Sequence, residues 1–284
     1  MVLNDWNLAG SGFPLASFFA PGDFYSFTAV PSLCIMPRVM ATERIYQTVL
    51  GLAAAHAAAT PLRRHLDVGA GTGRLIELFR QRFQTESSAC DYTDQLMKLP
   101  GQKVDIANLN HEKLPYPDGA FDIITATEVV EHLEDYRNVL RELYRVLKPG
   151  GLCILSTPNI LNLNSRLRFL WFGYWNLFGP LPVKNSALYS TGGHINPVSY
   201  FYLAHSLLDA GFSNVNFRVD KFQRSALSKL LFWFLPIKLF GALAWRREVF
   251  RFKTIDAVNA PLVKPTNSIP MLLGRTIVVA ATKS

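Results

Sequence analysis

The residues best suited to chemistry begin at positions 67–73, which read Asp-Val-Gly-Ala-Gly-Thr-Gly. Glycines at alternate positions let the backbone turn through positive φ and pass close to a ligand, because no Cβ stands in the way. Asp67 places a negative charge beside this turn, and Asp91 follows a second predicted strand. A glycine turn with an acid placed to bind ribose hydroxyls is typical of doubly wound sheets that bind adenosine-containing cofactors.

The spacing of the glycines separates two classes of cofactor. A dinucleotide site has the pattern G-x-G-x-x-G and leaves a helix N-terminus free to meet a pyrophosphate. This chain has D-x-G-x-G-x-G instead, and the leading acid would repel a pyrophosphate. The acid suits a cationic ligand that carries an ammonium and a sulfonium. The motif resembles the first motif of the class I S-adenosylmethionine-dependent methyltransferases.

Three further segments carry the same resemblance. Residues 114–124 read LPYPDGAFDII, residues 127–133 read TEVVEHL, and residues 140–151 read LRELYRVLKPGG. The last of these predicts a helix with one apolar face, ended by Pro-Gly-Gly. The resemblance covers roughly residues 60–222 and the last ten, and is nearest to the small-molecule and quinone O-methyltransferase type.

The resemblance implies an α/β fold. We expect a Rossmann-like, doubly wound, seven-stranded and mostly parallel sheet with the last strand antiparallel, plus helical lid insertions. The pattern predicts strands near 64–68, 87–90, 103–107, 121–125, 152–156, 214–220 and 275–281, and helices near 40–58, 73–83, 128–147 (in two pieces) and 198–210.

The chain divides into two predicted parts. Residues 1–60 form an N-terminal flap and helix, and residues 61–284 form the methyltransferase domain. The domain carries lid insertions at about 158–196 and 223–273, where the minimal fold needs only short connections. In the family's topology both insertions open at the ligand edge of the sheet, so we expect them to cover the active site.

The resemblance also assigns the residues of the donor site. The methionine portion of S-adenosylmethionine would meet the glycine turn, Asp91 would bind the ribose, and the segment after the third strand would meet the adenine. Asp105 competes for this last role, and Asp91 could instead be a surface acid. The implied cofactor-binding residues are Asp67, Gly69, Ala70, Gly71, Gly73, Asp91, Asn108, Leu109 and Glu128.

The run Glu128-x-x-Glu131-His132 predicts two carboxylates and an imidazole on one helical face. Similar runs hold a divalent metal in plant small-RNA 2′-O-methyltransferases and quinone O-methyltransferases, and His194 could complete such a set around Mg²⁺. Other family members use no metal at this place, and there the histidine lines the pocket. We prefer the metal-free interpretation, with His132 or His194 as the catalytic base that accepts a proton from the substrate.

Charge divides the chain unevenly. Residues 163–284 carry 15 Lys and Arg against 4 Asp and Glu, a net charge of +11, whereas residues 1–162 carry a net charge of −3. This imbalance favours an anionic partner such as a membrane surface, a phosphorylated lipid or a nucleic acid, with a merely solvated face as the alternative.

An apolar segment at 226–247 lies inside the basic half. Leu227, Leu230, Leu231 and Phe234 predict an apolar helical stripe with basic residues around it, as in a helix lying in a membrane interface. Two lysines and Pro236 interrupt the run, so we do not expect it to span a bilayer. The alternative is an ordinary lid that packs on the domain.

These observations predict a methyltransferase whose acceptor is a hydroxyl on a hydrophobic or lipid-linked small molecule or sugar. The rivals are an RNA methyltransferase and a binding protein that keeps the fold without catalysis. The 3 cysteines lack metal-ligand spacing, which favours a reducing cytoplasm. We expect a cytoplasmic protein that meets the inner face of the membrane peripherally.

Overall fold

The computed structural model describes residues 42–181 and 193–284, which all belong to one structural unit (Val39–Ser284). The expected flap before residue 42 and positions 182–192 of the first insertion lie outside this part of the chain. The strands are β1 (Arg64–Val68), β2 (Glu86–Asp91), β3 (Val104–Ile106), β4 (Phe121–Thr127), β5 (Leu147–Pro158), β6 (Phe212–Val219) and β7 (Thr276–Lys283).

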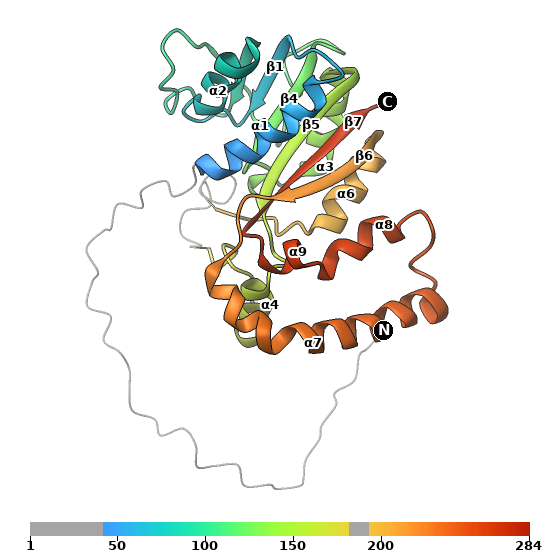
Figure 1. Cartoon of the computed structure of the whole chain (residues 1–284). Coiled ribbons are helices and arrows are strands. Elements are labelled where there is room, and N and C mark those ends of the chain that lie inside the picture. The colour runs from blue at the N-terminus through green and yellow to red at the C-terminus, as the bar shows by residue number, and fades with distance from the viewer. Residues whose placement is uncertain (1–41, 182–192) are drawn as a thin grey trace, which may run out of the picture. The chain divides into compact units, whose positions relative to one another are not determined.

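These strands form one sheet in the order β3-β2-β1-β4-β5-β7-β6 (Figure 1). All pairings among β1 to β5 are parallel. Strand β7 runs antiparallel to both β5 and β6. The predicted Rossmann-like sheet with an antiparallel last strand is therefore confirmed.

Helices cover both faces of the sheet, because successive strand residues point to opposite sides. Ile123 and Val278 pack against α1 and α2 on one face. Ile124 and Val279 pack against α3 and α6 on the other. These four helices are α1 (Glu43–Ala57), α2 (Arg74–Phe83), α3 (Tyr136–Val146) and α6 (Tyr200–Asp209).

The segment 128–147 forms two helical pieces, as predicted. A short 3-10 turn, η1 (Val130–His132), is followed by an extended residue and then by α3. Glu128 is left-handed with φ +57°, and its N–H bonds to the Ser156 carbonyl oxygen of β5 at 3.1 Å. The expectation that Glu128, Glu131 and His132 share one helical face is therefore wrong, because pairing with β5 holds the first of them at the end of the sheet.

Two helical segments extend the carboxyl end of the sheet. Helix α4 (Leu163–Phe172) follows β5. After β6 the chain forms α7 (Arg224–Arg247), the π-helix η2 (Glu248–Phe252), α8 (Ala260–Val263), the 3-10 helix η3 (Lys264–Asn267) and α9 (Ile269–Leu273). Helix α7 continues through Pro236 without a break.

Asn159 ties these two segments together. Its buried side-chain amide donates to the carbonyl oxygens of Met271 (2.8 Å) and Gly274 (2.9 Å) and accepts from the N–H of Leu161 (2.9 Å). An amide with three buried partners fixes the exits of β5 and α9 relative to each other.

We predict that Asn159→Ala lowers the free energy of unfolding by about 2–4 kcal/mol, because two buried carbonyl oxygens and one N–H lose their partner. Urea denaturation measures this change. Asn138→Ala is the matched control, since that side chain is exposed in α3, and it should leave stability nearly unchanged. Equal stability of the two variants would contradict the role of Asn159.

Candidate functional site

The candidate site lies where the strand order reverses. The chain leaves β1 toward β2 and β3 on one side and returns to β4 and β5 on the other. In such sheets the ligand crevice opens beyond the carboxyl ends of the central strands. Asp67 is at the end of β1, Asp91 ends β2, and Glu128 directly follows β4. The fold therefore brings these three acids to one edge.

The glycines of the turn after β1 have different tasks. A Cβ on Gly69 would lie 2.4 Å from Cγ2 of Val129, and a Cβ on Gly73 would lie 2.6 Å from Sδ of Met97. These two positions need glycine for close packing. A Cβ on Gly71 would meet no atom nearer than 4.0 Å, so the backbone is open to an approaching ligand there. All three have positive φ, which explains why only glycine serves.

Asp67 is buried at the centre of the site, with 2% of its surface exposed. Its neighbour across the β1–β4 pairing is Thr125, whose hydroxyl donates to Asp67 Oδ1 at 2.7 Å. Burial, the hydrogen bond from Thr125, which lowers the pKa, and the nearby charge of Asp91, which raises it, together bring the pKa of Asp67 to about 7, and burial is the largest cause. Asp91 accepts from the N–H groups of Gly71 (2.8 Å) and Tyr92 (2.7 Å), which leaves lone pairs for a further donor.

A chain of buried hydrogen bonds supports Asp67 from behind. His65 lies between Ser87 Oγ (3.1 Å) and Thr125 Oγ1 (2.8 Å), and its ring stacks on Phe79 at 4.0 Å. Because the Thr125 hydroxyl donates to Asp67, its oxygen accepts from His65 Nε2. Burial lowers the pKa of His65 to about 3, so the ring is neutral. This network orients the Asp67 carboxylate.

Four acids at this edge have no ion-pair partner among the described residues, and the charge of Arg275 offsets the burial of Glu128 only in part. Within the described parts of the chain, no Lys or Arg forms an ion pair with Asp67, Asp91, Glu128 or Glu131. Burial raises the pKa of Glu128 and Glu131, and for Glu131 the charge of Glu128 adds to the effect. Buried carboxylates without partners are costly, so this edge is suited to a cationic ligand.

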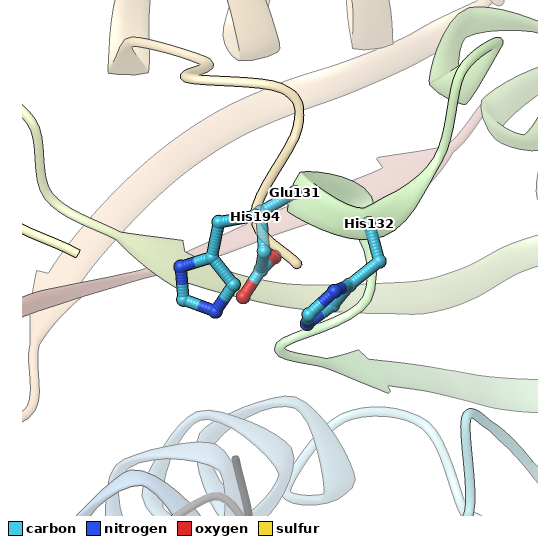
Figure 2. Close-up of side chains that lie close together, drawn as sticks. All are labelled: Glu131, His132 and His194. Atoms are coloured by element: carbon cyan, nitrogen blue, oxygen red, sulfur yellow. The ribbon is translucent and has the colours of Figure 1, made fainter. Parts of the chain in front are cut away.

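Glu131, one of these acids, also forms a group with His132 and His194 (Figure 2). Their potential ligand atoms lie within 4.8 Å of one another. His132 Nδ1 donates to the Gly193 carbonyl oxygen at 2.9 Å. Both carboxylate oxygens of Glu131 and both ring nitrogens of His194 are buried without a hydrogen-bond partner among residues 42–181 and 193–284. The group includes three of the four residues considered for a metal set, and Glu128 is not one of them.

The remaining predicted cofactor residues lie around the same edge. Ala70 is buried behind the turn. The N–H of Ala107 bonds to the Asp91 carbonyl oxygen, which brings the segment after β3 beside the ribose candidate. Asn108 is exposed and its amide oxygen accepts from the N–H of Asn110 at 3.2 Å, while Leu109 is half-buried. Asn108 therefore stabilises its own turn.

Sequence reasoning missed Tyr46, Thr125 and His65. Tyr46 on α1 lies near enough to Asp67 that burial and then that carboxylate raise the pKa of its hydroxyl. It also lines a cavity of about 430 Å³ with Gly73 and Lys98 beside the glycine turn. The only signal in the sequence was one tyrosine on the apolar face of a helix, and such a residue is ordinarily part of the core.

Comparison with known proteins identifies the family. A family model described as a methyltransferase domain matches residues 40–216, more than half of the chain. The chain belongs to this family and is an S-adenosylmethionine-dependent methyltransferase. The predicted family, enzyme class and cofactor are thereby confirmed.

Individual proteins agree with this family. A demethylmenaquinone methyltransferase of Listeria welshimeri is 32% identical over 169 residues, which cover 54% of this chain and 71% of that protein. A ubiquinone/menaquinone biosynthesis C-methyltransferase of Cronobacter sakazakii is 31% identical over 180 residues, which cover 54% of this chain and 67% of that protein. The solved structure of a methyltransferase of Archaeoglobus fulgidus shares the fold, with a TM-score of 0.51 and 18% identity. The match covers 84% of this chain and 94% of that protein.

The residues at the crevice fit S-adenosylmethionine. The open face of Gly71 admits a ligand against the backbone, and the carboxylates of Asp67 and Asp91 lack cationic partners within the described chain. The ligand carries an ammonium and a sulfonium, which would supply the missing positive charge. When bound, its sulfonium makes a methyl group available for transfer.

We predict that Asp67→Asn stabilises the ligand-free protein at pH 8 and weakens the binding of S-adenosylmethionine. The folded pKa of Asp67 lies above its unfolded value, so its contribution to stability is complete below about pH 4 and is lost as pH rises through about 7. Removing the buried charge should raise the free energy of unfolding at pH 8 by about 1–3 kcal/mol.

The affinity of the variant for S-adenosylmethionine should fall about 10-fold or more at pH 8, since one buried charge pair is lost. Urea denaturation and calorimetry measure the two effects. Exposed Asp94→Asn is the matched control and should change neither. A variant that is both less stable and equally tight in binding would refute this role of Asp67.

Proposed function

We propose that the enzyme transfers the methyl group to a hydroxyl of a hydrophobic or lipid-linked small molecule. The observation that carries the proposal is the group formed by Glu131, His132 and His194, which lies at the same sheet edge as the donor crevice. Apolar contact comes from Phe178, whose ring lies 5.2 Å from that of His194.

Each half of the crevice has a distinct role in this proposal. The methionine portion of the donor lies along Asp67, Gly69, Ala70, Gly71 and Gly73, and Asp91 accepts from the ribose hydroxyls. Asn108 and Leu109 border the adenine. Glu128 follows β4 with a left-handed backbone, and its carboxylate Oε1 accepts from the Ser156 hydroxyl of β5 at 3.3 Å.

His132 is the proposed base. Its Nδ1 donates to the Gly193 carbonyl oxygen, so the neutral ring carries its lone pair on Nε2. Burial lowers the pKa of His132 below its ordinary value, which keeps the ring neutral and able to accept a proton at pH 7. His132 Nε2 would take the hydroxyl proton of the acceptor, while the bound donor would supply the methyl group to the acceptor oxygen.

His194 and Glu131 hold the acceptor beside His132. The ring nitrogens of His194 and the carboxyl oxygens of Glu131 have no hydrogen-bond partner in the part of the chain that the structure describes, so they can bind an acceptor. Burial and the charge of Glu128 raise the pKa of Glu131 well above its usual range, which favours the protonated acid that can donate to an acceptor oxygen. Burial and the charge of His132 lower the pKa of His194 to about 4, which leaves it neutral as well.

A second candidate is transfer to a ring carbon of a quinol. Two relatives are named as methyltransferases of menaquinone and ubiquinone biosynthesis, one of them as a C-methyltransferase. The same base serves this reaction, because removing a phenolic proton makes the neighbouring ring carbon nucleophilic. The ring hydrogen is then lost as a proton. Mass spectrometry and NMR of the product distinguish an ether methyl from a ring methyl.

We predict that His132→Ala lowers kcat by about 10²–10⁴-fold with donor affinity unchanged, because it removes the proton acceptor. Wild-type kcat should rise with pH through a value below 6.5, and the variant should lose this rise. Methyl transfer from labelled S-adenosylmethionine to a quinol or polyprenyl-linked acceptor measures the rate. Exposed His205→Ala is the control. An unchanged pH profile in His132→Ala would contradict the assignment.

Metal use is a separate prediction. We propose that the group of three acts through its own protons and lone pairs, with Mg²⁺ as the alternative occupant of the carboxylate and imidazole donors. Methyl transfer should therefore be the same with and without a chelator. A loss of activity in chelator that added Mg²⁺ restores would favour the alternative.

An RNA acceptor is less well supported by the structure. Basic side chains of the 224–247 helix share their surface with exposed Leu and Phe residues, whereas phosphate-binding surfaces are mainly polar.

A further inference from the structure

Helix α7 exposes nearly all of its length. Ala226 is its one buried residue, although the helix has 24 residues. Leucines at four-residue intervals (Leu227, Leu231, Leu235, Leu239 and Leu243) form an outer apolar row, and Leu231 and Leu235 are 80% and 74% exposed. Phe232 and Phe240 widen this row. An aqueous protein rarely leaves so large an apolar face uncovered.

Helix α4 lies beside α7 and extends the apolar face (Figure 1). Leu170, Trp171 and Phe172 at its end are all exposed, Trp171 by 73%. The loop that follows adds Trp175, whose ring stacks on Phe169 at 4.5 Å. We call the exposed apolar residues of α4 and α7 together the α4–α7 face.

Basic residues border this face, and Glu248 is the one acid among residues 224–252. Helix α7 contains five Lys and Arg and no Asp or Glu, and its end and η2 bring together Arg246, Arg247 and Arg251. Lys238 lies over the ring of Phe234, and Arg168 lies over the ring of Phe172. Long apolar side chains framed by Trp, Lys and Arg are the composition of a helix buried in the headgroup region of an anionic membrane.

We propose that the α4–α7 face docks on an anionic lipid bilayer, with α7 lying in the plane of the membrane interface. The anionic lipids of a cytoplasmic leaflet would complement the basic border. This proposal does not depend on which acceptor is methylated, and it would hold even if the acceptor assigned above is wrong.

A helix lying flat fits the contacts of α7 better than one that crosses the bilayer. Residues 224–252 form a helical run long and apolar enough to span a membrane by length and composition. However, Leu230, Trp233 and Ile237 pack against the cluster of α4 and α9. Lys238 Nζ donates to the Asn267 carbonyl oxygen at 3.0 Å, and Gly241 approaches the side chain of the same residue closely. A crossing helix would lose these contacts.

The face leads toward the acceptor group. From the end of α4, the segment 173–178 turns back to place buried Phe178 against His194. Arg168 holds this segment by donating to the Trp175 carbonyl oxygen at 2.8 Å. One short segment therefore joins the end of α4 to the acceptor group.

Vesicle sedimentation of the full chain tests the proposal. Wild type should bind phosphatidylcholine vesicles that contain about 30% phosphatidylglycerol at low salt, and should bind neutral vesicles less well. The double variant Leu231→Glu, Leu235→Glu should bind about 100-fold more weakly, because it places charge where acyl chains would lie. Leu208→Glu on α6, also at an exposed leucine, is the matched control and should bind like wild type.

Four results would overturn the proposal. Wild type that fails to bind anionic vesicles, or a double variant that binds as tightly as wild type, would show that the face does not meet lipid. Membrane attachment that resists alkaline carbonate would show that α7 crosses the bilayer. Salt-sensitive retention on RNA without vesicle binding would assign the basic border to nucleic acid. Unchanged S-adenosylmethionine binding by the double variant shows that it is folded and separates this test from the proposed function.

Discussion

The site depends on carboxylates that the fold buries at the carboxyl edge of the sheet without an ion pair to any described Lys or Arg. Parallel pairing of β1 with β2 and β4 places Asp67, Asp91 and Glu128 at neighbouring strand ends. No described Lys or Arg forms an ion pair with any of the three, and burial raises the pKa of each. A cationic donor offsets the cost of this burial on binding. The open glycine turn gives the ligand access to the same place.

The same edge connects the donor to the rest of the molecule. Segments inserted after β5 and β6 extend from it, and Asn159 joins their ends. In the first insertion, the ring of Phe178 contacts that of His194. In the second insertion, α7 presents an exposed apolar face. One arrangement of strands thus explains where the methyl donor, the proposed acceptor group and the proposed membrane contact all lie.

Much of this fold could be predicted from the sequence, because local patterns determine it. The strands alternate between two buried faces, as Ile123 and Ile124 show, and helix stops such as Pro149-Gly150-Gly151 divide the elements. The helical face predicted for Glu128, Glu131 and His132 was wrong because tertiary pairing with Ser156 overrides local spacing. Tyr46, His65 and Thr125 were missed because only strand register and helix packing bring them to Asp67.

The most direct test of the central claim is calorimetry of S-adenosylmethionine binding in buffers of different ionisation enthalpy. At pH 6.5 the buried Asp67 is largely protonated, since its pKa is about 7. Binding the cation should therefore release roughly 0.5–1 proton per site, and the release should vanish well above that pKa. A binding heat that is independent of the buffer at pH 6.5 would contradict the account, because the acid at the centre of the crevice would then not respond to the charge of the donor.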